Sequence, residues 1–210
     1  EYISGPTLEQ KLKDGALEQR ESLEIVAQLA DALQEIHGLD ILHRDIKPAN
    51  IVLEDGRAIL MDFGLAKTET TVDQATLTGS REFVGTPLYL PPEQMLRGES
   101  DLRSDIFQLG LVLFEALVGH LPFAGRTMSD LIEHYSTNAD RKVRPSEHGI
   151  AVDKNVDELV ADCLSYDPQK RPATAAELAQ RCRRLTKDHQ LPKELLARFG
   201  DLRVIGRGGM

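Results

Sequence analysis

The most constraining feature of this sequence of 210 residues is a mostly apolar segment that runs from Asp105 to Val118. Its apolar residues lie on nearly every side of a helical projection, so a helix formed here offers solvent no polar face. Such a helix has to be buried on all sides, and we expect the core to be built around it. The longest apolar stretch within it, Leu109–Val118, is shorter than the roughly 20 residues that cross a bilayer, so no membrane segment is predicted in these residues.

Most of the other regular structure is also predicted to be helical. The segment from Ser22 to His37 places apolar residues three to four positions apart, which is typical of an amphipathic helix, and Gly38 ends it. Thr174 and Glu177 have the spacing of a capping box at the start of a later helix. Further helices are predicted approximately over residues 127–137, 156–166 and 174–188. Because only short strand-like runs such as Ile41-Leu42 interrupt these helices, the sequence predicts a mainly α (α+β) fold.

Two strand-like runs, residues 51–53 and 58–60, flank the dipeptide Asp55-Gly56. Asp-Gly between two such runs is a strong signal for a β-hairpin. Pairing around this turn places residue 50 opposite residue 61, which returns Asp62 to the side of Asn50. The sequence therefore predicts that a small hairpin gathers chemically active side chains that would otherwise be separate.

Those side chains are Asp45, Lys47, Asn50 and Asp62. Carboxylate and amide oxygens are hard donors of the kind that Mg²⁺ prefers. A second carboxylate can accept a proton from an attacking hydroxyl, and a lysine can neutralise charge on a phosphoryl group in transfer. The order and spacing of the set favour phosphoryl transfer over the simpler interpretation that these are solvated loop charges.

In this order the residues resemble the large lobe of a eukaryotic-type (Hanks-type) serine/threonine protein kinase. His43–Asn50 resembles the catalytic loop, and Asp62-Phe63-Gly64 resembles the magnesium-binding motif. The resemblance implies that Asp45 is the catalytic base, that Lys47 stabilises transferred charge, and that Asn50 and Asp62 hold the metal. Lys47 also resembles the serine/threonine class, and the implied fold is a large lobe with a small β-hairpin at the catalytic site.

The resemblance continues downstream. We name Gly85–Glu93 the substrate segment, because it resembles the stretch of the family that receives a peptide. It ends in Pro91-Pro92-Glu93, where the family usually has Ala-Pro-Glu. The resemblance implies a buried ion pair between Glu93 and Arg171, and it implies that Asp105 anchors a spine containing His43 and Phe63.

Upstream, Glu1-Tyr2-Ile3 resembles the hinge that meets adenine through its backbone. The implied contacts are the carbonyl of Glu1 and the amide of Ile3, with Val52 under the adenine ring. ATP and Mg²⁺ are thus the implied cofactors. The implied cofactor-binding residues are Glu1, Ile3, Lys47, Asn50, Val52 and Asp62.

The threonine-rich, aperiodic residues 67–86 are predicted to be a long loop. Thr76 and Thr78 resemble the phosphate acceptors of bacterial members of the family, and Arg44 resembles the arginine that pairs with such a phosphate. The resemblance implies autophosphorylation at Thr76 or Thr78 through self-association, and protein substrates with Ser or Thr acceptors.

The expected domain organisation is a kinase hinge and large lobe over residues 1–187, followed by a linker over 188–198. Residues 199–210 resemble the first strand and incipient Gly-rich loop of a second kinase small lobe. No Val-Ala-Ile-Lys-like segment occurs in the 210 residues, so we expect a fragment without its own small lobe that is inactive alone.

Composition excludes several classes of protein. The 25 basic and 34 acidic residues leave a net charge of −9, which disfavours nucleic acid as a partner. The two cysteines cannot form a disulfide scaffold, and the start lacks the basic region of a signal peptide, so a cytoplasmic location is expected. The alternatives to an active protein kinase are a non-catalytic kinase-like scaffold or regulatory module and a small-molecule kinase of the same fold.

Overall fold

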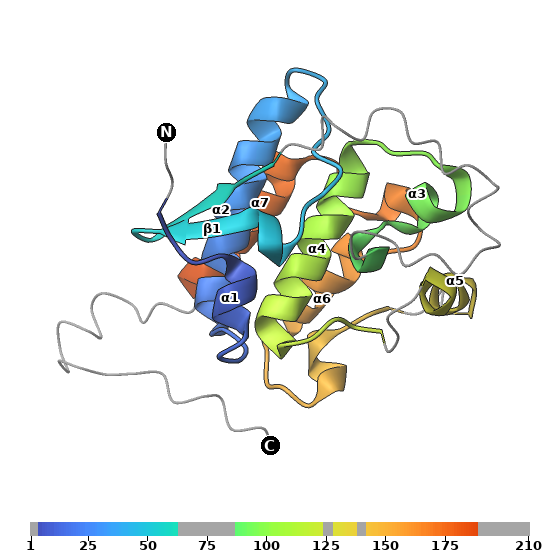
Figure 1. Ribbon diagram of the computed structural model, residues 1–210. Helices are drawn as coiled ribbons and strands as arrows, with labels where there is room; N and C mark the ends of the chain where they lie inside the picture. Colours follow the sequence, from blue (N-terminus) through green and yellow to red (C-terminus); the bar gives the residue numbers. More distant parts are fainter. Residues whose placement is uncertain (1–3, 63–86, 124–127, 138–141, 189–210) are drawn as a thin grey trace, which may run out of the picture.

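The structure is a computed structural model that describes residues 4–62, 87–123, 128–137 and 142–188 (Figure 1). In these parts of the chain helices predominate over one small antiparallel sheet, which confirms the predicted mainly α class. The α-helices are α1 (Leu8–Leu12), α2 (Gln19–His37), α3 (Pro92–Arg97), α4 (Leu102–Val118), α5 (Met128–Thr137), α6 (Lys154–Cys163) and α7 (Ala175–Asp188). The 3₁₀ turns are η1 (Pro48–Asn50), η4 (Pro87–Tyr89), η5 (Pro145–His148) and η6 (Pro168–Lys170). The strands are β1 (Ile51–Glu54) and β2 (Arg57–Leu60).

Helix α4 forms the centre of the molecule, as its apolar sequence predicts (Figure 1). Ile106, Leu109 and Leu113 are fully buried, and α2, α6 and α7 pack against the helix. A capping box between Asp101 and Ser104 starts α4 one turn before the apolar segment begins. The helix therefore carries polar residues in its buried first turn, where they can act on neighbouring segments.

The contact between α4 and α6 depends on one glycine. A Cβ atom at Gly110 would lie only 2.6 Å from the Cβ of Cys163, so the two helices approach too closely for any side chain there. Cys163 and Cys182 are free and buried, and burial raises the pKa of the Cys182 thiol to about 12. Both cysteines are thus inert core residues, in agreement with the expectation from sequence.

The hairpin is paired as the sequence predicts. Ile51 lies opposite Leu60 in β1 and β2, and Met61 donates from its backbone nitrogen to the Asn50 carbonyl at 2.8 Å. Asp55 and Gly56 both have positive φ, 49° and 76°, as two-residue hairpin turns require. The predicted strand-like run Ile41-Leu42 is wrong, because these residues form no strand and lead directly into the catalytic loop.

A side chain of helix α2 holds the turn of the hairpin. Gln28 accepts a hydrogen bond from the Ala58 nitrogen at 2.9 Å and donates to the Gly56 carbonyl at 3.2 Å. The hairpin thus rests on α2 (Figure 1), which also packs along α7. The described helices include none that combines the length and the hydropathy needed to cross a membrane.

Candidate active site

The catalytic loop, His43–Asn50, is held against the first turns of α4. The carboxylate of Asp105 accepts from the His43 nitrogen and from the Arg44 nitrogen, both at 2.9 Å. Asp105 is 1% exposed, so these hydrogen bonds are shielded from water. The expectation that Asp105 anchors His43 is confirmed, whereas Phe63 lies outside the described residues.

His37, at the end of α2, is a partner of Asp105 that the sequence analysis did not identify. Its Nε2 lies 2.8 Å from Asp105 Oδ2, and both side chains are almost fully buried. No spacing rule links two residues 68 positions apart. The one signal available in the sequence was that His37 is a polar residue at the end of the apolar face of this helix.

Gln108 is the second residue that sequence reasoning missed. It lies one turn after Asp105 on α4 and is 2% exposed. Its side chain accepts from the Ile46 nitrogen at 3.0 Å and donates to the carbonyls of Arg44 and Tyr89 at 3.3 and 3.2 Å. A polar side chain in the middle of the apolar segment could have drawn attention to it, since buried polar groups need partners.

The catalytic loop gathers three of the predicted site residues. Lys47 Nζ lies 3.1 Å from Asp45 Oδ2, and Asn50 Nδ2 donates to the same oxygen at 3.0 Å and to the Asp45 carbonyl at 2.8 Å. The side chains of Asp45 and Lys47 are 24% and 22% exposed. They are therefore ordered by their neighbours while part of each remains accessible to a substrate.

Asp62 lies two residues after the end of β2 and is exposed. It has a left-handed backbone with φ of 53°, an uncommon conformation for a residue other than glycine. Because the preceding Met61 is hydrogen-bonded to Asn50, the hairpin returns Asp62 to the side of Asn50 as predicted. Arg44, in the catalytic loop, has the same unusual conformation with φ of 66°. Such strain concentrates at functional sites, where the surrounding structure holds it in place.

His43 connects the catalytic loop with the hairpin. Its Nε2 is 3.1 Å from the Met61 carbonyl, and its Nδ1 accepts from the Asp45 nitrogen at 3.3 Å. Because a carbonyl can only accept and an amide can only donate, the ring is neutral with its proton on Nε2. Burial lowers the pKa of His43, against the opposing effect of Asp105, Asp45 and Asp62, which fits a neutral ring. Both predicted carboxylates, Asp45 and Asp62, thus lie close enough to one imidazole to act on its charge.

The donor set beside this imidazole fits a magnesium ion. The two hydrogen bonds that the Asn50 side chain makes within the described residues both use its nitrogen, which orients the amide so that its oxygen remains available for a cation. Asp62 is exposed and follows Met61, whose backbone nitrogen is hydrogen-bonded to Asn50. An amide oxygen and a carboxylate oxygen are ligands of the type that Mg²⁺ uses.

Glu93 at the end of the substrate segment forms the predicted ion pair. Arg171 donates from Nη1 and Nη2 to its two carboxylate oxygens at 2.7 and 2.8 Å, and Ser104 donates at 2.7 Å. The two charged side chains are 9% and 0% exposed. Burial alone would raise the pKa of Glu93, but the hydrogen bonds and charge of Arg171 outweigh it, so the pKa is lowered.

Tyrosines tie the rest of the substrate segment to the helices. The hydroxyl of Tyr89 in η4 donates to Glu115 on α4, and Tyr135 on α5 donates to the Leu90 carbonyl at 3.0 Å. Burial, and then the negative charge of Glu115, raises the pKa of Tyr89, so this hydroxyl remains a donor. The described part of the substrate segment is therefore attached to the same helix as the catalytic loop.

Of the remaining predicted site residues, some lie within the described residues and others do not. Val52 lies half-buried in β1 and forms an isolated bridge with Thr7. Glu1, Ile3, Phe63, Thr76, Thr78 and residues 189–210 lie outside the described residues.

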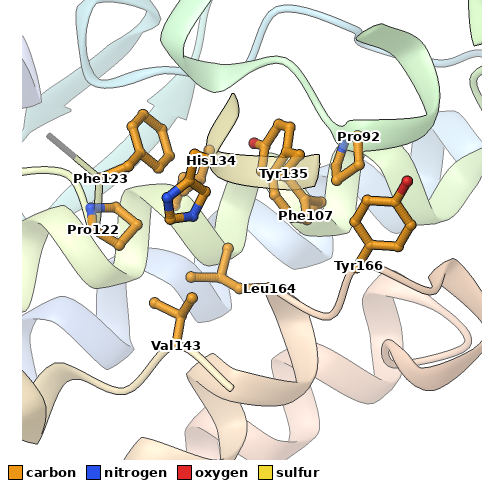
Figure 2. A pocket seen from close by; sticks show the side chains of 10 residues that line it. Pro92, Phe107, Pro122, Phe123, His134, Tyr135, Val143, Leu164 and Tyr166 are labelled. Atoms are coloured by element: carbon orange, nitrogen blue, oxygen red, sulfur yellow. The ribbon is translucent and has the colours of Figure 1, made fainter. Parts of the chain in front are cut away.

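A separate small pocket, lined mostly by apolar and aromatic side chains, borders the substrate segment at Pro92 (Figure 2). Figure 2 shows the rings of Phe123, His134 and Tyr135 grouped on one side of it. Its lining, in the described part of the chain, includes none of the predicted site residues. It is lined by Pro92, Phe107, Leu111, Pro122, Phe123, His134, Tyr135, Val143, Leu164 and Tyr166.

Comparison with known proteins agrees with this geometry. Residues 1–182 match the profile of the protein kinase domain. The serine/threonine-protein kinase PknB of Mycobacterium leprae is 38% identical over 181 residues, covering 85% of this chain and 28% of that protein. PrkC of Bacillus subtilis, also a serine/threonine-protein kinase, is 34% identical over 183 residues, covering 85% of this chain and 27% of that protein.

The fold is also found among solved structures. Residues 1–466 of Rad53, in a crystal structure with AMP-PNP, superpose with a TM-score of 0.67 and 28% sequence identity. The superposition covers 86% of this chain and 44% of that chain. The chain spans little more than a quarter of the length of the PknB and PrkC relatives. Since the matched region contains the whole arrangement around Asp45 and α4, the chain belongs to the Hanks-type serine/threonine protein kinase family.

Proposed function

We propose that the protein containing this chain transfers the γ-phosphoryl group of ATP, in the presence of Mg²⁺, to Ser or Thr hydroxyls of protein substrates. The observation that carries the proposal is the cluster of Asp45, Lys47 and Asn50 on a loop held to α4. The names of the PknB and PrkC relatives, and the ATP analogue bound to Rad53, support the same activity.

In this mechanism Asp45 accepts a hydrogen bond from the substrate hydroxyl and takes its proton as the oxygen–phosphorus bond forms. The bond between the γ-phosphorus and the bridging oxygen breaks, and ADP leaves. Lys47, 3.1 Å from Asp45, neutralises charge on the group in transfer. Asn50 and Asp62 would hold Mg²⁺, and the ion would supply positive charge that offsets the charge of the phosphates.

The nucleotide base is proposed to bind at the hinge. The carbonyl of Glu1 and the amide of Ile3 would pair with adenine, and Val52 would lie under its ring. The half-buried position of Val52 in β1, beside the segment that follows the hinge, is consistent with this role. Since ATP is the second substrate, we propose a cytoplasmic location for this part of the protein.

Phosphorylation of the chain itself is proposed at Thr76 or Thr78, in a reaction between two copies of the protein. Nε of Arg44 is buried and has no hydrogen-bond partner among the described residues. An unsatisfied buried guanidinium nitrogen is costly unless an acceptor reaches it. A phosphate oxygen on Thr76 or Thr78 supplies such an acceptor and would fix the loop to Arg44.

The domain organisation is proposed as it was predicted from sequence: hinge and large lobe over residues 1–187, a linker over 188–198, and the start of a second small lobe over 199–210. A small lobe supplies the Gly-rich loop and strand lysine that grip the phosphates. The isolated chain of 210 residues is therefore expected to transfer no measurable phosphate.

The experiment that tests the proposed activity is a phosphotransfer assay on the full-length protein with Asp45→Asn. Loss of a general base is expected to lower the rate about 10²-fold or more. Asp55→Asn is the matched control, because it makes the same change in the hairpin turn and should leave the rate unchanged. Wild-type protein that binds Mg²⁺ and ATP without transfer would instead identify a non-catalytic scaffold.

A further inference from the structure

We propose that Gln108 is a positioning residue that sets the place of Asp45 and links the catalytic loop to the substrate segment. The proposal rests on the proposed kinase function. Gln108 does not touch the reacting groups, and it acts through the backbone on either side of Asp45. Its side chain is 2% exposed, so water does not compete for its hydrogen bonds.

The first argument is the position of the three contacts. Gln108 Oε1 accepts from the Ile46 nitrogen at 3.0 Å, and its Nε2 donates to the Arg44 carbonyl at 3.3 Å. These groups belong to the residues immediately before and after Asp45. The side-chain amide of Gln108 therefore holds the backbone on both sides of Asp45, the proposed base.

The second argument is the strain in this backbone. Arg44 is in the left-handed region, with φ of 66°, which a residue with a side chain adopts only when its surroundings enforce it. Asp105 holds the Arg44 nitrogen at 2.9 Å, and Gln108 holds its carbonyl. Asp105 and Gln108 are three residues apart on α4 and so share one helix face. Without Gln108 the Arg44 backbone keeps, among the described residues, only the hydrogen bond at its nitrogen, and Asp45 can move with it.

The third argument is the link to the substrate segment. The same Nε2 that donates to Arg44 also donates to the Tyr89 carbonyl at 3.2 Å. Tyr89 is itself fixed to Glu115 on α4. A displacement of the segment that receives the peptide is therefore transmitted directly to the backbone at Asp45.

Only a neutral amide of this length satisfies all three partners, because it combines an acceptor with two donor hydrogens. Methionine has a similar length and volume but neither function. An ionised glutamate keeps the acceptor for Ile46 but turns an oxygen toward the carbonyls of Arg44 and Tyr89. A protonated glutamate restores one donor, so Gln108→Glu converts the contact into one that depends on pH.

The test compares Gln108→Met and Gln108→Glu with wild type in the full-length protein, by steady-state kinetics with varied ATP and varied peptide. For Gln108→Met we expect kcat to fall about tenfold or more, as when a reacting group is misplaced, with KM for ATP changed less than about twofold. The KM for peptide is expected to rise because the Tyr89 carbonyl loses its hydrogen bond from Gln108. Val160→Ala is the control for lost stability, because it leaves a cavity at a fully buried position of α6. It should lower Tm, while kcat measured well below Tm is retained.

The pH profile separates positioning from a purely structural role. The ratio of kcat for Gln108→Glu to kcat for wild type is expected to rise as pH falls and the buried carboxyl takes up its proton. The other titratable groups of the contacted segments and of the same helix turn are present in both proteins, so each enters both rates of the ratio. They are His43, Arg44, Asp45 and Lys47 in the catalytic loop, Tyr89 and Glu93 in the substrate segment, and Asp105 on α4. The corresponding ratio for Gln108→Met should not vary with pH.

The outcomes distinguish this proposal from the proposed function. If wild type transfers phosphate and Gln108→Met keeps the kcat of Val160→Ala, the positioning role of Gln108 is wrong and the kinase function remains. If wild type transfers no phosphate under conditions that activate kinases, the proposed function fails first. A ratio of kcat for Gln108→Glu to kcat for wild type that does not change with pH also contradicts the proposal. It would mean that holding the backbone around Asp45 does not require a hydrogen-bond donor at residue 108.

Discussion

At the scale of single residues, the ion pair of Glu93 and Arg171 shows that burial increases the loss of stability caused by substituting one partner. The pair is bidentate and nearly inaccessible, and the Arg171 guanidinium also lies 4.7 Å from the centre of the Phe107 ring. Removing one partner leaves an unpaired buried charge. The pair therefore fixes the end of the substrate segment to the centre of the molecule.

For Glu93→Gln we expect a loss of about 3–5 kcal/mol in the free energy of unfolding, measured by urea denaturation at neutral pH. The pH dependence has a definite sign. Because the pKa of Glu93 is lowered on folding from its ordinary 4.5, its stabilisation is complete above that value and is lost as pH falls through the folded pKa.

Glu93→Gln should therefore unfold with a shallower dependence on pH below about 4.5 than wild type. Glu158→Gln is the control, because Glu158 pairs with Lys142 and Arg144 at a far more exposed site. An equal loss of stability in both variants would contradict the buried-pair argument.

At the scale of elements, the hairpin and α2 form one unit through Gln28. The hairpin is short, and a two-stranded sheet of this size is marginal in water without support. Gln28 satisfies the Ala58 nitrogen and the Gly56 carbonyl at the turn, away from the ends that carry Asn50 and Asp62. The site therefore depends on a helix side chain that is remote from the chemistry.

We expect Gln28→Met to cost about 1 kcal/mol and to speed hydrogen exchange at the Ala58 amide, measured by NMR or mass spectrometry. Gln34→Met on the same helix is the matched control, since Gln34 accepts from the Ala176 nitrogen instead. That control should alter exchange at Ala176 and leave Ala58 unchanged. Unchanged exchange at Ala58 in Gln28→Met would show that the strand pairing holds the turn without α2.

At the scale of the whole molecule, α4 is the common support of the catalytic loop and of the substrate segment. Asp105 and Gln108 hold the loop, while Gln108 and Glu115 hold Tyr89. The buried Nε of Arg44, which has no hydrogen-bond partner among the described residues, lies in the loop that this helix supports. The proposed phosphate on Thr76 or Thr78 would supply an acceptor for this nitrogen.

The corresponding prediction concerns two copies of the full-length protein. Wild type incubated with ATP and Mg²⁺ should place phosphate mainly on Thr76 or Thr78 of an Asp45→Asn copy, detected by mass spectrometry of a size-tagged chain. The double variant Thr76→Val, Thr78→Val serves as the acceptor control. Phosphate confined to other positions of the inactive copy would reject these two sites.

The sequence by itself determined the local features of this protein. The order of Asp45, Lys47, Asn50 and Asp62, the turn at Asp55-Gly56 and the apolar length of α4 predict the family, the hairpin register and the central helix. These features depend on neighbours within a few residues, so spacing is enough to predict them.

Only the tertiary structure decided which side chains hold these features in place. The contacts of His37 with Asp105, of Gln108 with Ile46 and of Gln28 with Ala58 join residues 68, 62 and 30 positions apart. Such partners are chosen by how helices pack and by which buried polar groups then need satisfying. No periodicity along the chain encodes that choice, which is why Gln108 was found only in the folded molecule.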